Sequence, residues 1–170
     1  NLHNAKKART PIVNIVGEHA TYHIAYDAPL TADVEGIARP VSDWVRTSVD
    51  SKSVASDAAE AIAAARTFPG AISTLILPAD TAWTDGAGVA EVPVQAGPGA
   101  VGEAAVENCA AALCTGEPAM LLLGGRALRA PTLEIAGRIA AHSNAAIRSE
   151  LMSARTERGA GRVTVERIPY

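Results

Sequence analysis

Short apolar blocks separated by polar ones predict alternating strands and helices in the first half of this chain. Three runs rich in β-branched or aliphatic residues predict strands, and the first should be a buried parallel strand: Ile12–Val16, Val41–Thr47 and Ala71–Leu77. Residues 53–66 predict a helix, because small apolar residues recur on one face and Ser53 or Ser56 can cap it. With the end of another helix in residues 1–9, this order favours an α/β unit with a mainly parallel sheet.

The pattern changes at Thr84–Gly99, where four glycines and two prolines accompany no apolar period. Such a composition is typical of a linker between domains. Beyond it, helices over 101–114 and 132–142 should alternate with strands over 119–123 and 145–151, which resembles the opening of a second Rossmann-like unit. The last residues, 155–170, are basic and predict no closing element. We therefore expect two incomplete α/β domains, at 1–83 and 100–170, joined by residues 84–99.

Composition narrows the possible functions. The chain is 48% hydrophobic and 4% aromatic, which suits close packing of helices on a sheet. Its net charge is -3, and no basic run is longer than Lys6-Lys7, so a nucleic-acid partner is not expected. No apolar stretch is long enough to cross a bilayer and no signal peptide opens the chain, which predicts a cytoplasmic protein without a membrane partner. The start at Asn1 rather than Met suggests processing or a piece of a longer chain.

Two cysteines, Cys109 and Cys114, lie five residues apart within the first predicted helix of the second half. This is not the CxxC spacing of redox or zinc sites. We therefore predict two small buried thiols in a reducing compartment.

The segment from Glu18 to Leu30 is the best candidate for a ligand site. It follows the carboxyl end of a predicted strand, where open α/β sheets bind ligands, and it carries His19 and His23. Neither histidine has the spacing of a metal motif, so no metal site is expected here. Each histidine is as readily interpreted as a surface residue of a loop.

A second candidate is Gly124-Gly125, between a predicted strand and a helix, where a phosphate-binding turn would lie. The sequence is not GxGxxG, so a tight turn that needs small residues is the better interpretation. Arg126 and Arg129 could meet an anionic ligand, although solvated arginines are commoner.

Several motifs together resemble thiamine-diphosphate-dependent enzymes, and more closely acetolactate-synthase-like large subunits. A helix running into Thr10–Gly17 resembles the family's "TPIV-I-G" strand. The other matching segments are Asp27-Ala28 through Gly36–Pro40 ("DA…GI.RP"), Trp44, Ile76–Asp80 ("LP.D") and Pro118–Gly125. The resemblance covers essentially the whole chain.

This resemblance implies a Rossmann-like thiamine-diphosphate-binding fold, comprising the end of a pyrimidine-binding domain and the start of a central domain. The implied cofactors are thiamine diphosphate and Mg²⁺, with the metal site outside this segment and the ring-activating glutamate before Asn1. Glu18 and His19 would border the cofactor, whereas His23, Pro29, Leu30 and Ala79 would line the substrate channel. The partners would be a 2-oxo acid and further subunits in a homodimer or homotetramer.

The chain departs from true acetolactate synthases at three positions that bear on the substrate. Pro29-Leu30 replaces Phe-Gln, and Ala79 replaces the lysine of "LPKD". Thiamine-dependent chemistry on 2-oxo acids is thus expected more firmly than acetolactate formation itself. A 2-oxo acid or acyl-CoA decarboxylase, a non-catalytic paralogue serving ligand binding or assembly, and a free-standing nucleotide-binding module remain alternatives. The central-domain motif gives no support for flavin adenine dinucleotide (FAD).

Overall fold

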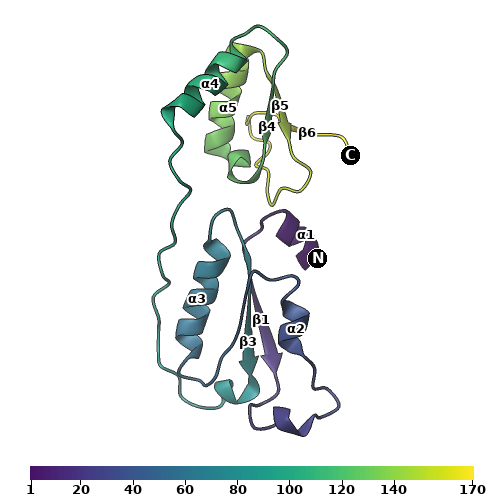
Figure 1. Cartoon of the computed structure of the whole chain (residues 1–170), viewed down its shortest axis with the longest axis vertical. Helices are drawn as coiled ribbons and strands as arrows, with labels where there is room; N and C mark the ends of the chain where they lie inside the picture. Colours follow the sequence, from purple (N-terminus) through teal and green to yellow (C-terminus); the bar gives the residue numbers. More distant parts are fainter. The chain divides into compact units, whose positions relative to one another are not determined.

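A computed structural model describes residues 1–170, which separate into two compact units, Asn1–Gly97 and Pro98–Tyr170 (Figure 1). The division falls inside the predicted linker, which contains no helix or strand between Trp83 and Glu103. Residues 84–97 group with the first unit, where Thr84 donates a hydrogen bond to the Ser51 hydroxyl and Thr67 donates one to the Gln95 amide oxygen. The assignment of the units to pyrimidine-binding and central domains stays a prediction.

The first unit is built on a three-stranded parallel sheet in the order β1-β3-β2, which confirms the predicted fold class. The strands are β1 (Ile12–Glu18), β2 (Trp44–Thr47) and β3 (Ile72–Pro78). Central β3 supplies most of the core, because Ile72, Leu75 and Ile76 are almost wholly buried.

Helix α3 (Val54–Arg66) covers one face of this sheet, and the short helix α2 (Val34–Ala38) lies on the other (Figure 1). Four alanines of α3 are buried, and their small side chains let neighbouring segments approach the helix closely: Ala59, Ala61, Ala63 and Ala65. Helix α1 (Leu2–Lys7) precedes β1, as the sequence predicted. Ser53 is the N-cap residue, as one of the two serines predicted for that position, but its side chain makes no cap bond. Its N–H donates to the Asp50 carboxylate.

The expectation that β1 is a buried strand is wrong. Its residues alternate between half-buried and exposed, and the Ile15 side chain is 60% exposed. Alternate side chains of a strand point to opposite faces, so the face of β1 that carries Val13 and Ile15 is left uncovered.

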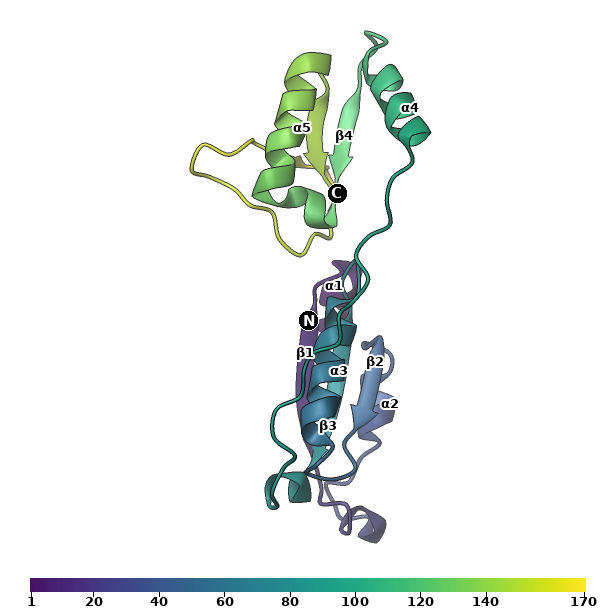
Figure 2. The ribbon, with the colours of Figure 1, turned by 90° about the vertical axis from the view of Figure 1, so that its left-hand side faces the viewer.

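The second unit has its own parallel sheet, in the order β4-β5-β6. Its strands are β4 (Met120–Leu123), β5 (Ala146–Ser149) and β6 (Glu166–Arg167), and its helices are α4 (Glu103–Leu113) and α5 (Ala130–Ser143). Helix α5 packs along the sheet (Figure 2). Leu128, Leu133 and Val165 form the core.

Two predictions for this unit are wrong. Both cysteines are exposed, because every residue of α4 except Leu113 faces solvent and the helix offers no core for a thiol. Segment 155–170, predicted to lack a closing element, contributes buried Val165 and the short strand β6. Two-residue strands carry too little periodicity to be predicted from a sequence.

Candidate functional site

The carboxyl ends of β1 and β3 lie side by side, with Glu18 in register with Pro78. Because the sheet is parallel, the segments that follow both strands emerge at the same edge. The segment after β1 runs through a single-turn 3₁₀ helix at Ile24–Tyr26 to α2, and β3 continues into another at Ala79–Ala82. This edge is where open α/β sheets bind ligands.

A cavity of about 630 Å³ lies at this edge. It is lined by residues of β1, β3, α2 and the connecting segments: Gly17, Glu18, His19, Ala20, Tyr22, His23, Leu30, Val34, Leu77, Ala79 and Trp83. Five of the six side chains predicted from the sequence therefore line one cavity. Pro29 is not among the lining residues; like Leu30 it is exposed, but only Leu30 borders the cavity.

The two histidines lie against one another on the cavity wall. Their ring centroids are 5.2 Å apart and their planes differ by 10°, so the imidazoles are stacked. A tight turn brings them together, since the His23 N–H donates to the Ala20 carbonyl at 2.8 Å and Ala20 is buried. In the sequence the two histidines are four residues apart with no predicted helix to align them, and in the structure the turn aligns their rings.

Glu18 carries the carboxylate of the site. Its Oε1 accepts a hydrogen bond from the backbone N–H of His19 at 2.7 Å. Leu30, Leu77 and Trp83 are among the lining residues, and the cavity is open to solvent where the Leu30 and Trp83 side chains are exposed. The cavity thus combines one carboxylate and two imidazoles with apolar walls.

Asp80 anchors the segment after β1 to the end of β3. Its Oδ1 accepts from the Thr21 N–H at 3.0 Å and its Oδ2 from the Thr21 hydroxyl at 2.6 Å. These bonds, chiefly the one from the hydroxyl, hold the pKa of Asp80 below its ordinary value, so it stays ionised and accepting at neutral pH. The sequence marked Asp80 only as part of a motif, because its partner is 59 residues away.

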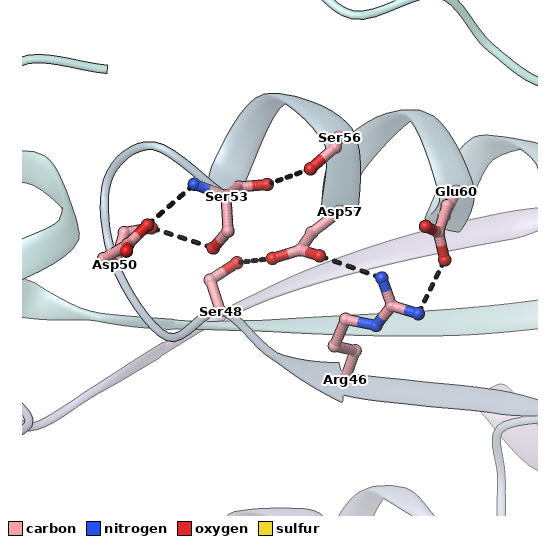
Figure 3. Close-up of polar contacts among 7 residues, drawn as sticks. All are labelled: Arg46, Ser48, Asp50, Ser53, Ser56, Asp57 and Glu60. Carbon is pink, nitrogen blue, oxygen red and sulfur yellow. Dashed lines mark hydrogen bonds and ion pairs between the residues drawn. The ribbon is translucent and has the colours of Figure 1, made fainter. Parts of the chain in front are cut away.

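A second polar network, which the sequence did not reveal, joins β2 to α3 (Figure 3). The buried Asp57 carboxylate accepts from Arg46 Nη1 at 2.9 Å and from the fully buried Ser48 hydroxyl at 2.8 Å. Arg46 also pairs with Glu60 at 2.6 Å. Burial alone would raise the pKa of Asp57, but the bonds from Arg46 and Ser48 outweigh it and hold that pKa below its ordinary value.

No three side chains among His, Cys, Asp and Glu come together in a way that could hold a metal ion. None of the helices is both long enough and apolar enough to cross a membrane.

No protein-family model matches the chain. Over its full length it is 48% identical to a protein of Mycobacterium tuberculosis named "Putative acetolactate synthase large subunit IlvX". The chain spans 32% of that relative, about a third of its length.

Solved structures share the fold. A "putative thiamin diphosphate-dependent enzyme" of Mycobacterium smegmatis matches with a TM-score of 0.70 and 21% identity over 91% of this chain and 30% of its own. A thiamine-diphosphate-dependent 4-hydroxybenzoylformate decarboxylase of Rhodococcus jostii matches with a TM-score of 0.69 and 18% identity, over 91% of this chain and 30% of that one. Benzoylformate decarboxylase of Polynucleobacter necessarius matches with a TM-score of 0.65 and 21% identity, covering 91% and 29%.

Proposed function

This chain belongs to the thiamine-diphosphate-dependent enzymes, as the acetolactate-synthase-like resemblance in its sequence indicated, and we propose that its cavity forms part of an active centre for 2-oxo acids. The reaction would form or cleave a carbon–carbon bond next to the 2-oxo group. The complete activity would require further residues, in keeping with the share of about a third of its relative that the chain spans.

The observation that carries the proposal is the meeting of Glu18, His19 and His23 around one cavity at the carboxyl edge of the sheet. Thiamine diphosphate, when bound, supplies the electron sink that stabilises a carbanion next to a former carbonyl. A cavity with a carboxylate and apolar walls fits the polar, flat aminopyrimidine part of that cofactor, and Glu18 would accept a hydrogen bond from it. The stacked imidazoles would donate hydrogen bonds to the carboxylate of the 2-oxo acid.

We further propose that the diphosphate and Mg²⁺ are held by residues outside this chain. The intact enzyme would be a homodimer or homotetramer, because in this family the cofactor lies between the domains of two subunits.

Decarboxylation without ligation is the second candidate reaction. It is favoured by Leu30 and Ala79, which line the cavity where synthases carry polar side chains. Two of the similar structures also have decarboxylase names. Product analysis with a 2-oxo acid distinguishes the two, since ligation gives an acetohydroxy acid and decarboxylation gives an aldehyde. A non-catalytic paralogue would give neither.

The test is to replace Glu18 in the full-length parent enzyme. Glu18→Ala should lower turnover or cofactor affinity by at least roughly tenfold, which corresponds to about 1.4 kcal/mol. Glu91→Ala, at an exposed residue of the first unit that does not line the cavity, is the matched control and should leave both unchanged. Wild-type kinetics and cofactor affinity in Glu18→Ala would place the site elsewhere.

A further inference from the structure

A carboxylate of the chain itself lies against the Gly124-Gly125 turn of the second unit and accepts a hydrogen bond from it. The turn joins β4 to α5, where Rossmann-like folds hold the phosphate of a nucleotide on backbone N–H groups. Here the Gly125 N–H donates to Oε1 of Glu150, directly after β5, at 3.2 Å. A Cβ atom at position 124 would collide with the same carboxylate, so the space that glycine leaves open is filled by Glu150.

A second carboxylate accepts a hydrogen bond from the first backbone N–H of α5. Oε2 of Glu157 accepts from the Ala130 N–H at 2.7 Å, and the backbone N–H of Glu157 donates to the Leu128 carbonyl at 3.0 Å. The Ala130 bond is the main reason why the pKa of Glu157 lies below its ordinary value, and the charges of Arg155 and Arg129 lower it further. Arg129, one of the two arginines that could have met an anionic ligand, thus helps to lower the pKa of a carboxylate of the chain itself.

The segment that carries both glutamates, residues 150–165, is fixed by packing, and we call it the strap. Buried Val165 at its end packs with Leu128 and Leu133 in the core, and Val163 lies against Gly137 of α5. Beyond it, β6 pairs with β5. The strap therefore crosses the turn as an ordered part of the unit.

We propose that the strap is a built-in occupant of this turn, so that the second unit does not take the phosphate of FAD or of another dinucleotide. An incoming phosphate would have to displace both carboxylates or approach them as a like charge, which is unfavourable at short range. The residues thus do not fit FAD. The inference rests on the second unit alone, and its failure leaves the proposed function of the first unit untouched.

Nuclear magnetic resonance of the 170-residue chain tests directly whether the two glutamates accept these backbone hydrogen bonds. The amide proton of Ala130 should shift with pH, with a midpoint below that of an ordinary glutamate, because its acceptor is the Glu157 carboxylate. Glu157→Gln should abolish this titration, whereas Glu117→Gln, at an exposed residue outside the strap, should preserve it. If Glu157→Gln fails to fold, Glu150→Gln is the second variant, and it should move the Gly125 amide resonance because it replaces the acceptor of that N–H.

Titration of the same chain with FAD tests the consequence. We expect no saturable binding below about 1 mM. An Ala130 amide that does not titrate in the wild-type chain would overturn the proposal. So would saturable FAD binding that moves the Gly125 amide resonance.

Discussion

At the scale of single residues, Asp80 determines where the cavity-lining segment lies. It accepts two hydrogen bonds from Thr21, which follows Glu18 and His19 in the chain. Asp80→Ala should therefore speed hydrogen exchange of the Thr21 amide by roughly tenfold, the effect of losing one net hydrogen bond. Asp85→Ala, whose side chain is exposed, is the control. Unchanged exchange at Thr21 would mean that the segment is held by other contacts.

At the scale of elements, the Asp57 network fixes α3 to β2. Asp57→Ala leaves the buried Ser48 hydroxyl without its acceptor and removes one partner of Arg46, so the free energy of unfolding should fall by about 1–3 kcal/mol. Because the folded-state pKa of Asp57 is lowered, its contribution is complete above the unfolded-state pKa and is lost as pH falls through the folded-state pKa.

Urea unfolding at neutral and acidic pH measures this contribution. The difference between Asp57→Ala and the wild type should shrink on acidification, and Asp85→Ala should show no such difference at either pH. A difference that is independent of pH would assign the loss to packing rather than to charge.

At the scale of the whole molecule, we expect the chain to carry only part of the proposed active centre. By the family resemblance, the ring-activating glutamate and the metal–diphosphate site lie outside it. Calorimetric titration of the 170-residue chain with thiamine diphosphate and Mg²⁺ should therefore give no micromolar binding. Tight binding would show that the residues around Glu18 suffice for the cofactor. The expectation that essential cofactor-binding residues lie outside this chain would then be wrong.

Local pattern determined the elements of this protein, because hydrophobic periodicity, β-branched runs and glycine or proline punctuation act over a few neighbouring residues. Strands near Ile12, Ala71 and Ala119, the helices around residues 53–66 and 132–142, and the change at Thr84–Gly99 all followed from that pattern. The position of Glu18 and His23 after a strand likewise placed the candidate site at a sheet edge.

Tertiary structure decided what depends on partners distant in sequence. The uncovered face of β1 exposes Ile15, and the solvent-facing α4 exposes both cysteines, since burial depends on which elements pack together. The pairing of Thr21 with Asp80 likewise required the fold, as did the strap that brings Glu150 and Glu157 to the glycine turn. A sequence pattern shows which residues are polar or apolar. A hydrogen bond between residues tens of positions apart forms only when folding brings the two residues together.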